Sequence, residues 1–217
     1  MEDIFNNYSP LNAINVSRET FADFETFISM VMDKNKDINI ISKKTAKKDI
    51  IRNRHIIDSA QAIEFVDFNE DTTCDIGSGG GMPGIVIAII LKNLKKKMKL
   101  NLYEKSHHKS TFLKSVSRKL ELDTEVIQED IFKSSKIKSG TILARAFKPL
   151  PVVLDLVHQN FSSYNNLVMF MGKNGKQVMN EASKKWDFEY KEKRSITSKD
   201  SFLLSIKNIK KKWHRHK

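Results

Sequence analysis

The sequence has little of what several protein classes require. Cys74 is the single cysteine in 217 residues, which excludes a disulfide framework and a metal site built from cysteines. Long apolar runs are absent too, and the N-terminus has no basic segment followed by an apolar one. We therefore expect a cytoplasmic protein with no membrane partner and no metal, and we expect Cys74 to pack within a strand.

Glycine and proline are scarce as well, with 8 and 4 residues, and five of the glycines fall within 77–84. The chain contains no internal repeat and no low-complexity linker. With 217 residues, 40% of them hydrophobic, it can fill the core of one α/β domain with an added element. We predict a helical cap over 1–66, the α/β domain over 67–208 and a basic tail over 209–217.

Acidic residues are fewer than basic residues in this sequence. The chain has 38 Lys and Arg residues against 26 Asp and Glu, which is a formal net charge of +12. Such an excess favours a polyanionic partner, and nucleic acid is the first candidate. A coding bias toward lysine, asparagine and isoleucine would produce the same excess, so charge alone does not decide the partner.

The most informative stretch is 72–84, which reads T-T-C-D-I-G-S-G-G-G-M-P-G. Its first five residues are β-branched and apolar enough for a buried strand. The apolar run 84–91 predicts a helix, and Pro83 suits the first turn, where its missing N–H is not needed. A strand, a glycine turn and a helix N-terminus together predict a cradle of nucleotide size.

Asp75 limits which classes of ligand this cradle can bind. A G-x-G-x-x-G pattern from Gly79 to Gly84 is weak by itself, and the chain has no Gly-Lys-Ser/Thr of a P-loop. A carboxylate at Asp75 would repel a pyrophosphate and suits a cationic ligand or an amino group. The run D-x-G-x-G-x-P-G resembles motif I of the S-adenosylmethionine methyltransferases. Their ligand has an amine, a sulfonium and no phosphate.

Strand and helix patterns alternate along the rest of the chain. Two helices, 17–33 and 48–65, precede the first strand, and the apolar positions of 17–33 form one face. The alternation predicts a doubly wound parallel sheet with a C-terminal hairpin on one edge. The predicted strands cover 72–76, 99–104, 124–128, 141–144, 167–171, 188–196 and 201–207.

Candidate ligand contacts follow the second and third strands. Glu104 closes the second strand at the place where an acid hydrogen-bonds ribose hydroxyls, and a solvated charge is the alternative. Ile131 and Phe132 follow the third strand and are placed to cover an adenine. A helix cap near Asp130 is an equally weighted interpretation.

The fourth strand ends where a methyltransferase holds its acceptor, and 144–149 reads A-R-A-F-K-P. Amino-group methyltransferases typically carry an Asn/Asp-Pro-Pro-aromatic motif there, which this chain lacks. Methylation of C5 in a pyrimidine needs a nucleophilic cysteine, and Cys74 is on the wrong strand. An acceptor that is already nucleophilic remains, such as guanine N7. Arg145 would orient the base, hold the cofactor side, or pair with Asp75 or Glu104.

Several motifs in this order resemble one family, the bacterial small-subunit rRNA guanine-N7 methyltransferases, also called glucose-inhibited division protein B. They are R-H-I-x-D-S at 54–59, the glycine run, Phe112-Leu113 and R-A-F at 145–147. The resemblance covers about residues 20 to 207. It implies a Rossmann-like class I methyltransferase with a seven-stranded, mostly parallel sheet and an N-terminal helical extension.

The resemblance also implies methyl transfer from S-adenosylmethionine to N7 of one guanine in the decoding-region loop of 16S rRNA. The RNA partner would be free 16S rRNA or the small ribosomal subunit, and the enzyme would act as a monomer. The implied cofactor contacts are Asp75, Gly77, Gly79, Gly81, Met82, Glu104, Ile131, Phe132 and Arg145, of which Arg145 is also the catalytic candidate. The implied RNA contacts are Arg54, His55 and Lys173.

Two departures from the family pattern stand out. The family usually has a lysine before the glycine that follows strand five, where this chain has Met171, Gly172 and then Lys173. The acid after strand two is commonly Asp, and here it is Glu104. Three alternatives stay open: methylation of another RNA or a small molecule, a nucleotide-dependent oxidoreductase, and an rRNA-binding protein without cofactor affinity.

Overall fold

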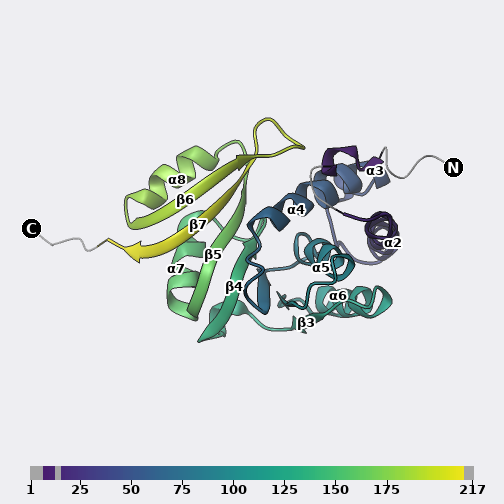
Figure 1. The fold of residues 1–217 in the computed structure, drawn as a ribbon, viewed down its shortest axis with the longest axis horizontal. Helices are drawn as coiled ribbons and strands as arrows, with labels where there is room; N and C mark the ends of the chain where they lie inside the picture. The colour runs from purple at the N-terminus through teal and green to yellow at the C-terminus, as the bar shows by residue number, and fades with distance from the viewer. Residues whose placement is uncertain (1–6, 13–15, 213–217) are drawn as a thin grey trace, which may run out of the picture.

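Seven strands form one mixed sheet in the order β3-β2-β1-β4-β5-β7-β6 (Figure 1). The computed structural model describes residues 7–12 and 16–212. Neighbouring strands from β3 to β5 pair in parallel, and β7 runs antiparallel to both β5 and β6. The strands are β1 (Thr72–Ile76), β2 (Lys99–Tyr103), β3 (Thr124–Ile127), β4 (Ile137–Ala144), β5 (Phe161–Met171), β6 (Trp186–Arg194) and β7 (Phe202–Lys211). The predicted parallel sheet with an edge hairpin is confirmed.

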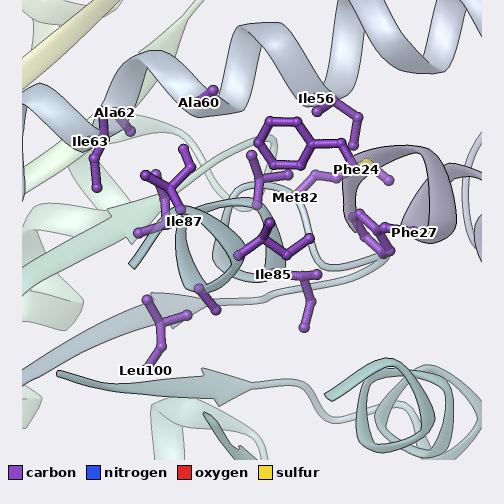
Figure 2. Close-up of a cluster of buried hydrophobic side chains, with 14 of the residues drawn as sticks. Phe24, Phe27, Ile56, Ala60, Ala62, Ile63, Met82, Ile85, Ile87 and Leu100 are labelled. Atoms are coloured by element: carbon purple, nitrogen blue, oxygen red, sulfur yellow. The ribbon is translucent and has the colours of Figure 1, made fainter. Parts of the chain in front are cut away.

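One face of the sheet is covered by α5 (Gly84–Asn93), which is buried on all sides from Gly84 to Leu91. A second layer, α2 (Arg18–Lys34), packs on the side of α5 that faces away from the sheet. Because α5 is covered on both sides, it needs no polar face. Figure 2 shows Phe24 and Phe27 of α2 meeting Ile85 of α5 in the same apolar cluster. The helical cap and the sheet therefore share one core.

The other face is covered by α7 (Leu150–Asn160) and α8 (Gly175–Ser183) (Figure 1). Their apolar sides form a second buried cluster with β4, β5 and β7, and Trp186 at the start of β6 closes it. Cys74 is buried in this cluster, as predicted for strand packing. The remaining long helix, α6 (His107–Lys119), lies on the same side as α5. None of the helices in the described ranges has the length and apolarity to cross a membrane.

The predicted helix 48–65 is a continuous helical run whose hydrogen bonding changes along its length. It passes from α3 (Lys48–Ile51) through a π-helix (Arg52–Ile57) to α4 (Asp58–Ala60) and a 3₁₀ turn (Gln61–Phe65). π-helical turns are rare and frequently occur at functional sites. The short 3₁₀ turns elsewhere are Ser9–Leu11, Lys43–Thr45 and Ile131–Lys133.

A buried charge cluster holds the start of this run against α2. Arg52 is only 7% exposed and donates to Glu25 and Asp49 at 2.7 Å each. Lys48 and the Tyr8 hydroxyl also contact Glu25, each at 2.9 Å. These partners hold the pKa of Glu25 at about 2, although burial alone would raise it. Arg52 thus finds its charged partners within the cap.

The largest differences from the predicted strand boundaries occur in β4, β5 and β7. β4 begins at Ile137 instead of 141, because Gly140 continues the strand where a break was expected. β5 begins at Phe161 instead of 167, and its polar first part is paired with β4 and satisfied by side-chain bonds such as the one that the Thr141 hydroxyl donates to Oδ1 of Asn166 (2.9 Å). β7 continues through Lys211, so the tail predicted from 209 begins inside a strand. Residues 213–217 lie outside the described ranges.

Candidate active site

A cavity of about 410 Å³ opens at the carboxyl ends of β1, β2 and β4. Ligands of open α/β sheets bind at this edge, where the connecting loops diverge. Its walls come from several places in the sequence: the glycine turn, the segments after β2, β3 and β4, and Ile41 and His55 of the cap. The cavity therefore combines the predicted α/β site with the N-terminal segment.

The glycine turn forms the floor with backbone that other residues rarely adopt. Gly77 and Gly79 line the cavity and have φ of +70° and +56°. A Cβ added to Gly77 would lie 2.2 Å from Cδ2 of Phe147, so only glycine lets that ring cross the turn. Gly81 does not line the cavity, and a Cβ added to it would meet Ile85 and Leu113, so it packs closely against α5 and α6, while its cofactor contact stays a prediction.

Asp75 lies beneath the turn and does not line the cavity. Its carboxylate oxygen Oδ2 accepts from the backbone N–H of Gly84, at the start of α5, at 2.9 Å. Burial raises the pKa of Asp75 to about 7, although this hydrogen bond favours the charged form. In this structure Asp75 ties β1 to α5 and shapes the turn from below, and its contact with a cationic ligand stays a prediction.

Glu104 lies on the cavity wall directly after β2, as its position predicted. Its two carboxylate oxygens accept from the backbone N–H groups of Gly79 (2.8 Å) and Ser106 (2.7 Å). A carboxylate has about four acceptor positions, so each oxygen keeps one for a ligand hydroxyl. Glu104 therefore joins the glycine turn to the second strand and remains able to accept from a ribose.

Two stacked aromatic side chains, Phe132 and Phe147, form another part of the cavity wall. The Phe132 ring is 43% exposed and stacks on Phe147 with centroids 5.9 Å apart. Ile131 is buried beside it, and Asp130 accepts from the Phe132 N–H at 3.3 Å, so the predicted helix cap is also present. These apolar surfaces match the requirement for covering a flat base.

Arg145 lines the cavity from the end of β4 and is held by the cap. Its Nη2 donates to the Arg54 carbonyl (2.6 Å) and pairs with Asp58 Oδ2 (3.1 Å), while Nη1 donates to His55 Nδ1 (3.2 Å). A guanidinium has five N–H donors, and the other two have no partner within 7–12 and 16–212. The predicted ion pair with Asp75 or Glu104 is wrong, because Asp58 takes that position.

The contact with Arg145 determines the tautomer of His55. A guanidinium only donates, so Nδ1 must accept and the proton of a neutral ring must sit on Nε2. Burial, with Arg145 adding to it, lowers the pKa of His55 to about 4, so the ring is neutral at pH 7. Its Nε2 is buried without a partner in the described part of the chain. Such orphaned donors are rare.

Comparison with known proteins connects this arrangement to a family. The family model of rRNA small subunit methyltransferase G (GidB) matches residues 20–209. The chain belongs to this family. A GidB relative from Pelagibacter ubique, named ribosomal RNA small subunit methyltransferase G, is 62% identical over 98% of this chain and 100% of its own. A protein of the same name from Bartonella tribocorum is 34% identical over 90% of this chain and 91% of its own.

Solved structures support the fold. The alignment with a SAM-dependent methyltransferase from Aquifex aeolicus covers 70% of this chain and 89% of that protein's chain, at TM-score 0.53 and 12% identity. The alignment with TrmK from M. capricolum, solved with S-adenosyl-homocysteine, covers 69% of this chain and 66% of the TrmK chain, at TM-score 0.51 and 14% identity. The GidB chain therefore has the Rossmann-like class I methyltransferase fold that its motifs predicted. Membership of this family sets aside the oxidoreductase alternative.

The predicted RNA contacts of this GidB chain fall in different places. His55 lines the cavity, whereas Arg54 contributes its backbone carbonyl to Arg145 and leaves its side chain exposed. Lys173 lies outside the cavity, on a neighbouring hollow of about 520 Å³ that shares Phe147 and Lys148 with it. Within the described residues no three His, Cys, Asp or Glu side chains are grouped to hold a metal.

Sequence reasoning missed several residues of the site. Phe147 was visible in the R-A-F motif, and its ring over Gly77 explains why an aromatic residue stands there. Lys109 is on the first turn of α6 and lines the cavity, as do Tyr103 and Ile41. No local signal marks these positions, because neighbouring elements bring them to the cavity only after folding.

Proposed function

We propose that this chain transfers the methyl group of S-adenosylmethionine to N7 of one guanine in the decoding-region loop of 16S rRNA. One observation carries the proposal. The R-H-I-x-D-S and R-A-F motifs, about 90 residues apart, meet through Arg145 on the wall of the cavity formed by the glycine turn. The 62% identity with a ribosomal RNA small subunit methyltransferase supports the choice of substrate.

The lining of the cavity fits the cofactor. Its 410 Å³ falls within the range of about 300–1,000 Å³ usual for small-molecule sites. Glu104 would accept from the ribose hydroxyls, and Ile131 with Phe132 would cover the adenine. Gly77 and Met82 would lie along the methionine end, where the backbone allows a close approach. When bound, S-adenosylmethionine supplies an electrophilic methyl group on its sulfonium.

The protein would act by alignment and by excluding water. Guanine N7 has a lone pair and no proton to lose, so in-line displacement needs no general base. The two free N–H donors of Arg145 would orient the acceptor base against the cofactor side, and the Phe132–Phe147 pair would shield it from solvent. Positioning of this kind can account for a large part of a rate enhancement, about 7–11 kcal/mol in favourable cases.

The RNA would approach from the open side of the cavity. Lys105, Lys109 and Lys148 line that side, and Lys173 stands on the neighbouring hollow. The net charge of +12 adds a long-range attraction for phosphate. We take the small ribosomal subunit or its free 16S rRNA as the partner, and lysine contacts to phosphate would make binding weaken with added salt.

Labelled S-adenosylmethionine incubated with unmodified small subunits, and with naked 16S rRNA in parallel, tests the proposal. Cleavage of the RNA at 7-methylguanine would map the modified base. We expect label at one guanine, and the preferred RNA form identifies the substrate. No transfer to either RNA, with cofactor binding intact, would contradict the proposal and redirect it toward another RNA or a small molecule.

A further inference from the structure

The tip of the β6–β7 hairpin reaches the cap at the residue that pairs with Arg145. Ser195 and Thr197 both donate their hydroxyls to Oδ1 of Asp58, at 3.0 and 2.8 Å. In Figure 1 the loop between β6 and β7 lies beside α4, whose first residue is Asp58. These hydroxyls are more than 130 positions away from Asp58 in the sequence.

A second contact docks the same tip. Gln61 accepts from the backbone N–H of Ile196 at 2.9 Å and donates to the Asp58 carbonyl at 3.1 Å. The backbone of Ile196, the residue after Ser195, is therefore fixed against the cap. The tip is fastened to α4 and the following 3₁₀ turn by backbone and side chain together, so the two hydroxyls have little freedom to leave Asp58.

The two oxygens of Asp58 have different partners. Oδ1 accepts from the two hydroxyls of the tip and, at 3.3 Å, from Gln61 Nε2, and Oδ2 pairs with Arg145 Nη2 at 3.1 Å. The side chains of Asp58 and Arg145 are 14% and 18% exposed, so water competes only weakly for either group. Hydrogen bonds to Oδ1 fix the plane of the carboxylate and thereby the direction of Oδ2.

We propose that Asp58 is a positioning residue for Arg145, and that Ser195 and Thr197 of the hairpin tip hold Asp58 in place. The C-terminal hairpin is then part of the active site without lining the cavity. This inference rests on the proposed function for the role of Arg145 in methyl transfer. We therefore expect Asp58, Ser195 and Thr197 to affect the rate of methyl transfer and not the binding of either substrate.

Variants of the tip separate positioning from folding. Thr197→Val has a similar volume but removes the hydroxyl, and we expect kcat to fall roughly tenfold with KM for the subunit unchanged. Thr197→Ser keeps a hydroxyl and should restore most of the rate. Ser198→Ala is the control, because Ser198 contacts Ser201 in the same tip and not Asp58. An equal loss in Ser198→Ala would overturn the proposal.

The decisive comparison repeats Thr197→Val in an Arg145→Ala background. If the tip acts through Arg145, the second change should alter the residual rate less than twofold. The same tenfold loss in both backgrounds would mean that Thr197 acts by another route, and the positioning role would be rejected. Ser195→Ala provides a second, independent test of the same coupling.

A readout without any substrate separates this inference from the proposed function. In protein labelled with ¹⁵N-arginine, the Arg145 side-chain signal can be assigned by its loss in Arg145→Ala. We expect that signal to shift in Thr197→Val and Ser195→Ala and to stay in place in Ser198→Ala. An unmoved signal would refute the positioning role. A shift in an enzyme that transfers no methyl group to rRNA would refute only the proposed substrate.

Discussion

The two sides of the cavity are built in different ways. The side formed by the glycine turn consists largely of consecutive backbone from Gly77 to Met82, with Glu104 accepting from one of its N–H groups. The side around Arg145 consists of side chains from the cap and from the segment after β4, and hydroxyls of the hairpin tip hold them from behind without lining the cavity. The first is specified by one motif, and the second exists only when three distant segments have packed.

This difference predicts different sensitivities. Backbone conformations with positive φ strain most residues other than glycine, and the Cβ of any other residue at Gly77 would meet the Phe147 ring, so the turn should respond sharply to an added side chain there. The Arg145 side depends on hydrogen bonds that can be removed one at a time, and each removal should change the rate while the fold persists. The experiments below probe one side or the other.

The largest effect is expected from Gly77→Val. Its Cβ would meet the Phe147 ring at 2.2 Å, and its φ of +70° is strained for a β-branched residue. We expect binding of S-adenosylmethionine, measured by calorimetry, to weaken at least about 100-fold. Gly172→Val is the matched control, since no atom lies within 4 Å of its added Cβ. Unchanged affinity in Gly77→Val would remove the turn from the cofactor site.

Arg145→Ala should lower methyl transfer by about 100-fold, because an orienting group is lost from the cavity wall. Asp58 keeps the hydroxyls of Ser195 and Thr197, so the melting temperature should fall by only a few degrees. Initial rates with labelled cofactor and thermal unfolding measure the two effects. Arg118→Ala, on the exposed side of α6, is the control. Full activity in Arg145→Ala would exclude Arg145 from the reaction.

Glu104→Gln should have a smaller effect on the opposite side. An amide has one acceptor oxygen where the carboxylate has two, so one of the bonds from Gly79 and Ser106 is lost along with a charged ribose partner. We expect cofactor affinity to drop about tenfold. Glu121→Gln, on the exposed turn after α6, should bind normally. If both variants bind equally well, Glu104 does not contact the cofactor.

Asp75→Asn should affect function least and stability in a pH-dependent way. The pKa of Asp75 is raised to about 7, so the stability it contributes is complete below its unfolded pKa and is lost as pH rises through 7. Asparagine keeps an acceptor for Gly84 and does not titrate. The unfolding free energy of the wild type minus that of the variant should therefore fall by roughly 3 kcal/mol between pH 4 and 7.

Chemical denaturation across that pH range provides the measurement. Asp71→Asn, exposed just before β1, serves as the control and should show no such trend. A difference between wild type and Asp75→Asn that stays constant from pH 4 to 7 would mean that the carboxylate is ionised throughout, tied to the Gly84 N–H as an anion.

Much of the turn side was predictable, because its signals are local. The strand 72–76, the glycine turn and the acid at Glu104 occur in the predicted places, and the alternation of strands and helices predicted the sheet. The role of Asp75 was not predictable, because its direction depends on how α5 begins. A sequence pattern places a carboxylate at a strand end but does not say which N–H it meets.

The Arg145 side was predictable only in part. The motifs marked Arg145 and His55 as site residues, but the ion pair with Asp58 depends on the docking of the cap. Apolar spacing predicted a helix over 48–65, whereas the π-helical hydrogen bonding of Arg52–Ile57 has no signal in that spacing. The contribution of Thr197 depends on a hairpin register that only the folded sheet determines.

The shared core of the cap and the sheet has a consequence for the order in which the protein is made. Synthesis runs from the N-terminus, so the cap and the glycine turn leave the ribosome before Arg145, and Ser195 and Thr197 leave later still. The apolar cluster that joins α2 to α5 can close early, while the partners of Asp58 are still missing. The Arg145 side of the cavity is thus completed after the glycine-turn side, once the β6–β7 hairpin is available.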